Sequence, residues 1–73
     1  MTEKEVVIRG DYITLGQLLK LIGAADSGAS VKRLLEIGEV TVNDEPESRR
    51  GRKLRPGDLV FMPPGVRIRL DST

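Results

Sequence analysis

The chain has no cysteine, no histidine and no tryptophan, and it has only one tyrosine and one phenylalanine among 73 residues. Without cysteine it forms no disulfides, and without cysteine and histidine it lacks the usual zinc ligands and the commonest general base. Its serines therefore have no customary partner that would make them nucleophiles. No Walker loop or Rossmann glycine fingerprint occurs. These absences predict a protein that is not an enzyme and that binds no metal or other cofactor.

Long apolar runs are also missing, since none approaches the roughly 18–20 residues that a membrane-spanning helix needs. The acidic start, Thr2-Glu3-Lys4-Glu5, is unlike a signal peptide. We therefore expect a cytoplasmic protein with no membrane partner. A chain of 73 residues is too short for two cores, which predicts a single domain over residues 1–73. We also expect a monomer.

The net charge of +1 conceals an uneven distribution of charge along the chain. Residues 1–48 carry five basic and nine acidic side chains, whereas residues 49–73 carry seven and two. Residues 49–55, called the basic segment below, hold Arg49, Arg50, Arg52, Lys53 and Arg55. Many charge runs are only solvated surface, but such a local concentration is typical of proteins that bind a phosphate backbone.

Two short helices are predicted in the first half of the chain. Thr14 and Gln17 have the spacing of a capping box, and the apolar positions that follow recur every three to four residues. This pattern predicts a helix over about residues 14–22. Asp26 or Ser27 can cap a second helix, whose apolar residues again share one face. The connection between the two is short enough for a helical hairpin.

The remaining segments are predicted to be β-strands. We expect strands at residues 5–9, 39–43, 59–62 and 66–70, the first of them at a sheet edge, because these segments are β-branched or alternate with a period of two. Residues 43–46 are predicted to form a turn, and residues 55–58 suit a type II turn. The predicted class is α+β, with two short helices packed on a small, mostly antiparallel β-sheet.

Two further motifs carry a family resemblance. Residues 38–43 read G-x-V-x-V-N, and residues 56–60 read P-G-D-x-V, with the basic segment between them. In this order, after a helix pair, they resemble the αL RNA-binding domain first named for ribosomal small-subunit protein S-four. The resemblance covers about residues 13–62, so the strand at 5–9 is an addition. The chain looks most like the small stand-alone bacterial members of that family.

The resemblance implies an αL RNA-binding motif that recognises structured RNA without catalysis. Ribosomal RNA, or a ribosomal particle that contains it, is the expected partner. The family's binding mode places helix two beside the following β-loop. Carried onto this chain, it gives the candidate RNA-binding residues Ser27, Ser30, Lys32, Arg33, Arg49, Arg50, Arg52, Lys53 and Arg55.

This chain departs from the family pattern at the start of both helices. Thr14 stands where members commonly have a basic residue, and residues 27–32 lack the usual arginines. Recognition is therefore expected to depend more on the basic segment. Ser27 is either a helix cap or a phosphate ligand. Because aromatic residues are scarce and Phe61 is predicted to lie in the core, we expect recognition of RNA shape and charge rather than base stacking.

Two other functions compete with RNA binding. A protein-interaction module of a ribosomal or replication assembly would also explain the divided charge. A β-grasp sulfur carrier shares the V-x-V-N strand and the G-D-x-V turn, but its chemistry requires a C-terminal Gly-Gly, and this chain ends Leu70-Asp71-Ser72-Thr73. The carboxylate pairs Glu36/Glu39 and Glu45/Glu47 are interpreted as solvated groups rather than as catalytic acids and bases.

Overall fold

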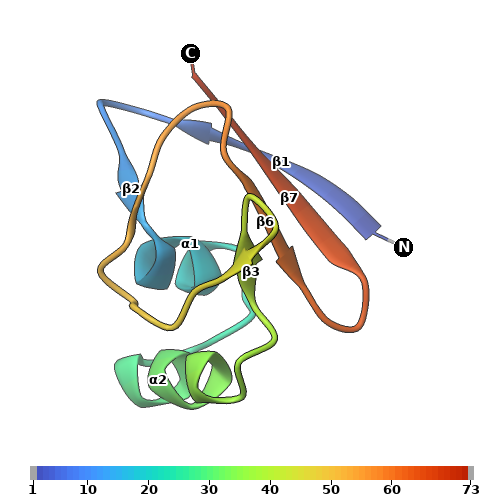
Figure 1. The fold of residues 1–73 in the computed structure, drawn as a ribbon. Helices are drawn as coiled ribbons and strands as arrows, with labels where there is room; N and C mark the ends of the chain where they lie inside the picture. The colour runs from blue at the N-terminus through green and yellow to red at the C-terminus, as the bar shows by residue number, and fades with distance from the viewer. Residues whose placement is uncertain (1, 73) are drawn as a thin grey trace.

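The computed structural model describes residues 2–72 and has the predicted α+β class (Figure 1). None of the helices in this range is long and apolar enough to cross a membrane. The elements, in chain order, are β1 (Thr2–Ile8), β2 (Ile13–Thr14), α1 (Leu15–Leu21), α2 (Gly28–Glu36), β3 (Thr41–Val42), β4 (Glu45–Pro46), β5 (Lys53–Leu54), β6 (Leu59–Met62) and β7 (Val66–Ser72).

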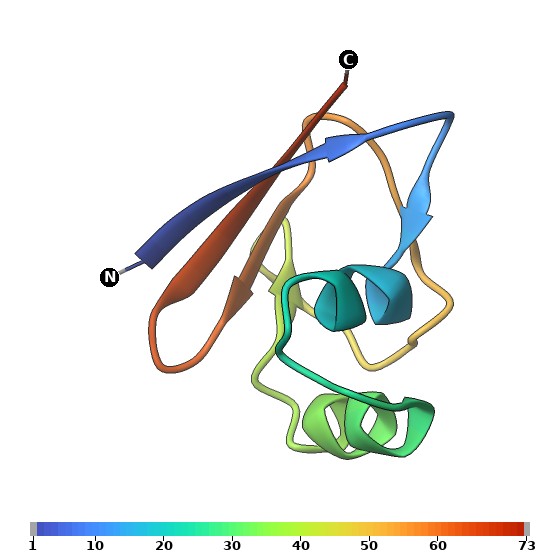
Figure 2. The same ribbon diagram turned by 180° about the vertical axis from the view of Figure 1, so that it is seen from behind.

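The main sheet has five strands in the order β1-β7-β6-β3-β4. Strand β1 lies at one edge, as predicted, but it begins at Thr2 and runs parallel to β7. The other pairings are antiparallel. Strands β2 and β5 form a separate antiparallel pair. In the view from behind, both helices lie below β1 (Figure 2).

Both helices form for the predicted local reasons. Thr14 and Gln17 make the capping box that begins α1, and the Ser27 hydroxyl accepts a hydrogen bond from the Ser30 N–H at the start of α2. The apolar faces of the helices pack against the inner face of the sheet. The buried core is Ile8, Leu15, Leu18, Leu19, Ala25, Val31, Leu35, Val40, Val42, Leu54, Val60, Ile68 and Leu70.

The predictions for residues 39–46, a strand followed by a turn, need correction. The strand expected at 39–43 is confined to Thr41–Val42, and the turn expected at 43–46 is only two residues long. Asn43 and Asp44 have φ angles of 52° and 70°, so the chain reverses there and Glu45–Pro46 pairs back as β4. Positive φ at both central residues is the geometry of a type I′ hairpin turn.

Phe61 is half-buried and lies outside the core, contrary to prediction. Val42, Val60 and Ile68 are in register across three strands and face the helices. Phe61 follows Val60 directly and therefore points to the opposite face, where it pairs with Arg67. The turn predicted at residues 55–58 is confirmed: Gly57 has a φ of 97°, and the Asp58 N–H donates to the Arg55 carbonyl at 3.0 Å.

Candidate nucleic-acid interface

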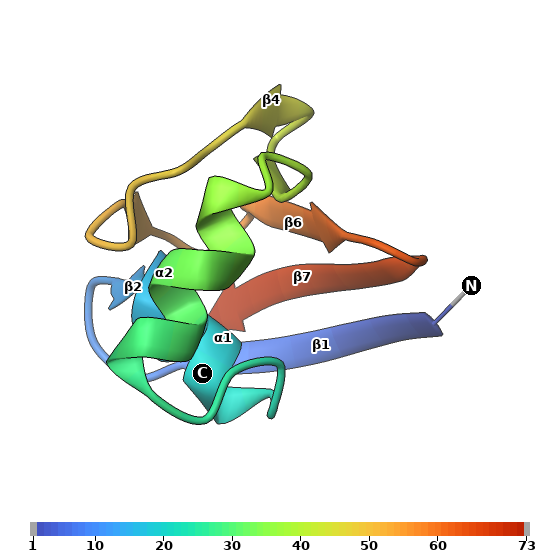
Figure 3. The same cartoon turned by 90° about the horizontal axis from the view of Figure 1, so that it is seen from below.

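The basic segment is attached to the start of α1 by its backbone. The Leu15 N–H donates to the Arg52 carbonyl, and the Gly16 N–H donates to the Arg50 carbonyl, each at 2.9 Å. The first amides of a helix have no partner within it, so these carbonyls satisfy groups that would otherwise be left open. The antiparallel pairing of β2 with β5 adds a second connection between the basic segment and the residues that precede α1. The basic segment therefore lies beside the junction of β2 and α1 (Figure 3).

Glu47 is buried beneath the basic segment and binds several of its donors. Its side chain is only 8% exposed, so the interpretation of this carboxylate as a solvated group was wrong. It accepts hydrogen bonds from the Arg49 Nε and Nη2 at 3.2 and 3.0 Å, and from the Arg52 Nη1 at 2.9 Å. The N–H groups of Ser48 and Arg49 also donate to it. The loop folds its backbone and two arginines around one carboxylate.

These contacts explain an unusual acidity. Hydrogen bonds from Arg49, opposed by the loss of hydration on burial and reinforced by Arg52, lower the pKa of Glu47 from 4.5 to about 2. The same contact raises the pKa of Arg49. Glu47 is therefore ionised at neutral pH and cancels part of the local positive charge. Arg49 nevertheless keeps 74% of its side chain in solvent, so its guanidinium remains accessible to a further ligand.

The other three cations of the basic segment have different surroundings. The Lys53 Nζ lies 5.0 Å from the centre of the Tyr12 ring, which is a cation–π contact. The side chains of Arg50 and Arg55 make no ion pair or hydrogen bond with any residue that the structure describes. They are the least compensated charges of the segment.

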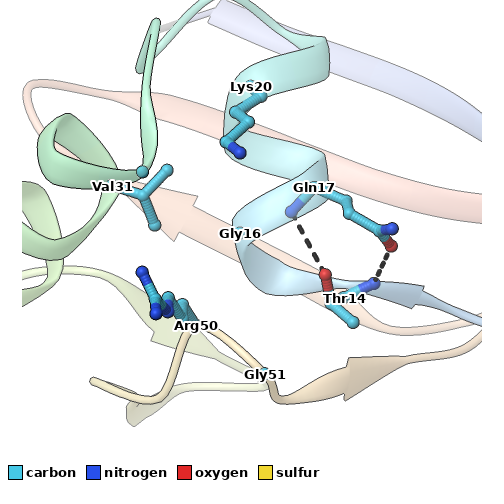
Figure 4. A pocket seen from close by; sticks show the side chains of 8 residues that line it. Thr14, Gly16, Gln17, Lys20, Val31, Arg50 and Gly51 are labelled. Atoms are coloured by element: carbon cyan, nitrogen blue, oxygen red, sulfur yellow. Dashed lines mark hydrogen bonds between the residues drawn. The ribbon is translucent and has the colours of Figure 1, made fainter.

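The basic side chains border two hollows. The first, of about 410 Å³, is bordered by Arg49, Gly51, Arg52, Lys53 and Arg55. The second, of about 280 Å³, lies between the basic segment and the two helices (Figure 4). Its lining residues are Thr14, Gly16, Gln17, Lys20, Gly28, Val31, Arg50 and Gly51. Arg50 thus lies close to Gly28, the first residue of α2, while the other four cations of the basic segment border the first hollow.

Comparison with known sequences decides the family. The family model described as "S4 domain" matches residues 6–70 of this chain. The chain belongs to the S4 domain family. It is also 53% identical over 55 residues to a protein of Bacillus subtilis (strain 168) named "Probable ribosome maturation protein RlbA". That alignment covers 75% of this chain and 78% of the relative. The family resemblance proposed from the sequence motifs is therefore confirmed.

The start of α2 is occupied by its own hydrogen bonds in this S4 domain. The Ser27 hydroxyl caps the helix, and the Ser30 hydroxyl donates to the Asp26 carboxylate at 2.7 Å. Asp26 already places a negative charge near the positive end of the helix. Lys32 and Arg33 are exposed on α2 but border neither hollow. The candidate residues of α2 and those of the basic segment therefore do not all line one site.

Lys20 borders the second hollow but was not among the candidate residues predicted from the sequence. It lies on α1, four residues after Gly16, and it borders the second hollow together with Arg50. A spacing of four residues brings side chains to the same face of a helix. Lys20 is the only charged residue of α1, which could have marked it as a functional candidate. The sequence does not show, however, that the basic segment docks on that face.

Gly16 permits a close approach of α1 and the basic segment. A Cβ atom at Gly16 would lie 3.3 Å from both the Cβ and the carbonyl oxygen of Arg50. We expect Gly16→Val to lower the free energy of unfolding by about 1–3 kcal/mol, the usual cost of overpacking. Gly51→Val is the control, because no atom lies within 4 Å of a Cβ there. Urea denaturation measures both variants, and equal stabilities would contradict the close docking.

Proposed function

We propose that this S4 domain is a non-catalytic RNA-binding protein that acts in ribosome maturation and recognises structured ribosomal RNA. The observation that carries the proposal is the docking of the basic segment on α1. Four of its five cations border one open hollow, and two of these are oriented by Glu47. A fixed guanidinium suits phosphate oxygens because its donors are planar and can bind in pairs.

The comparisons supply the biological context of the proposal. The relative from Bacillus subtilis is named as a ribosome maturation protein, and its alignment with this chain covers most of both sequences. In a bacterium such as Bacillus subtilis, ribosomes mature in the cytoplasm, where we expect this chain to act as a monomer. The proposed interface centres on residues 49–55 and extends along α2 through Lys32 and Arg33. Ser27 and Ser30 contribute chiefly by fixing the start of that helix.

A salt titration of RNA binding tests the proposed function. If about four or five phosphates are neutralised, the logarithm of the affinity should fall against the logarithm of salt concentration with a slope of about −3 to −4.5. The titration is made with a folded ribosomal RNA fragment and with an unstructured RNA of the same length. We expect tighter binding to the folded fragment, because shape and charge dominate recognition of helical RNA.

Three results would count against this function. A slope near zero would show that phosphate contacts do not drive binding. Equal affinity for folded and unstructured RNA would remove the claim of structural recognition. If the protein instead binds ribosomal particles whose accessible RNA has been digested, a protein partner becomes the better explanation, as the divided charge of the sequence also allows.

A further inference from the structure

The hollow between α1, α2 and the basic segment brings together two cations that are distant in sequence. Lys20 extends from α1, and Arg50 extends from the basic segment, and their charged ends point into the same space (Figure 4). The hollow measures about 280 Å³. This is at or below the lower limit of ordinary small-molecule sites, which start at about 300 Å³, so it suits a single small group.

Both cations lack a compensating charge. Within residues 2–72, neither the Lys20 ammonium nor the Arg50 guanidinium forms an ion pair or a side-chain hydrogen bond. None of the eight residues that line the hollow is acidic. Two like charges that face a shared space repel each other, and an anion placed between them would turn that repulsion into attraction. The side chains that line the hollow therefore favour a negatively charged ligand.

The backbone on one side of the hollow is held in place before any ligand arrives. The Gly16 N–H holds the Arg50 carbonyl at 2.9 Å, so the backbone that carries this arginine cannot move freely. The Arg50 guanidinium lies close to Gly28, since a Cβ atom at Gly28 would be 3.7 Å from the Arg50 Nη1, an ordinary van der Waals contact. A backbone that is already ordered loses less entropy when a ligand binds, so the ordering that remains is that of the two exposed side chains.

We propose that this hollow binds one phosphate group of the RNA backbone. The planar guanidinium of Arg50 would donate paired hydrogen bonds to two phosphate oxygens, and Lys20 would supply a point charge from the α1 side. The inference rests on the proposed RNA-binding function and deepens it. It places the phosphate beside Gly28, away from the side of α2 where Ser30 already donates to the Asp26 carboxylate.

A charged side chain at Gly28 provides the sharpest test. Gly28 is the first residue of α2, where a glutamate favours the helix, so Gly28→Glu should fold normally. Its carboxylate would lie beside Arg50 and compete with the phosphate. We expect the affinity for the folded RNA fragment to fall about tenfold and the salt slope to become shallower by about 1, the effect of losing one phosphate contact.

Matched variants separate occupation of the hollow from a general charge effect. Ala29→Glu adds the same charge at the next, exposed position of the same helical turn, outside the lining of the hollow. Gly28→Gln adds the same volume without charge. We expect Ala29→Glu to bind RNA nearly as well as wild type and Gly28→Gln to fall between the other two. Equal losses in Gly28→Glu and Ala29→Glu would overturn the phosphate site.

A double-mutant cycle tests whether the two cations share one phosphate. If Lys20→Gln and Arg50→Gln remove contacts to the same group, their effects on RNA affinity will be coupled, and the double variant will lose less than the product of the single losses. Independent effects would overturn the shared site. Wild-type binding with a steep salt slope, combined with no response to Gly28→Glu, would reject this inference alone, whereas absence of wild-type binding would reject the proposed function itself.

Inorganic phosphate distinguishes a backbone phosphate from a free anion. In an NMR titration of the protein with inorganic phosphate, we expect weak shifts of the Gly51 amide that disappear in Gly28→Glu. Shifts in the wild type that are accompanied by unchanged RNA affinity in Gly28→Glu would show a site for free phosphate, and they would overturn its assignment to RNA.

Discussion

Replacement of Arg50, Lys53 and Arg55 together by glutamine is expected to weaken binding to structured RNA by about 100- to 1,000-fold at about 0.1 M salt. Each phosphate contact contributes about a factor of ten under these conditions through the release of counterions, and the salt slope should become shallower by about 2–3. These three side chains are chosen because none of them bonds to Glu47. Their removal leaves the internal ion pairs of the loop intact.

Folding and total charge are controlled by a second triple variant. Lys4, Arg9 and Arg67 are also exposed, and they lie on β1, just after it, and on β7. Their replacement by glutamine changes the net charge by the same amount away from the basic segment. We expect this control to retain most of the RNA affinity in a fluorescence anisotropy titration. Similar losses in the two triple variants would show that binding depends on overall charge and not on the proposed interface.

Loss of the Glu47 charge is expected to destabilise the protein near neutral pH. Glu47→Gln keeps the size of the side chain but weakens the hydrogen bonds from Arg49 and Arg52. We expect the free energy of unfolding to fall by about 1–2 kcal/mol at pH 7. This range is set below what the pKa shift would give, because both arginines remain partly exposed and water screens their charges.

The pH dependence of this difference identifies its electrostatic origin. Folding lowers the pKa of Glu47 from 4.5 to about 2. The ionised carboxylate therefore stabilises the folded wild type fully when the pH is above 4.5, and this contribution is lost as the pH falls toward about 2. The wild type and Glu47→Gln should therefore differ at pH 7 and become similar near pH 2. Urea denaturation at several pH values measures the difference. Glu45→Gln, at an exposed position two residues earlier, should match the wild type throughout.

Local signals in the sequence predicted the helices and their caps well. The capping box of α1 needs only residues three positions apart, and the Ser27 cap likewise depends on one helical turn. The turn around Gly57 follows from one glycine that adopts positive φ next to a proline. In each case the interactions that select the conformation lie within a few residues, so the sequence alone contains the needed information.

Predictions that depended on which way a side chain points were less successful. All four residues of β6 are apolar, so no alternation indicates which of them faces the helices. Pairing with β3 and β7 buries Val60 and leaves Phe61 on the outer face. A similar failure affected Glu47, since the identity of a glutamate beside a turn does not show that the chain will fold two arginines over it.

The sequence by itself determined the α+β class, the two capped helices, the concentration of cations in residues 49–55 and the S4 domain family. These features depend on composition, on periodicity and on short motifs. The tertiary structure alone decided which cations are bound to Glu47, which remain uncompensated, and that Lys20 faces Arg50 across a hollow. The physical reason is that α1 uses loop carbonyls more than thirty residues away to satisfy its first amides, and no local pattern encodes that distant pairing.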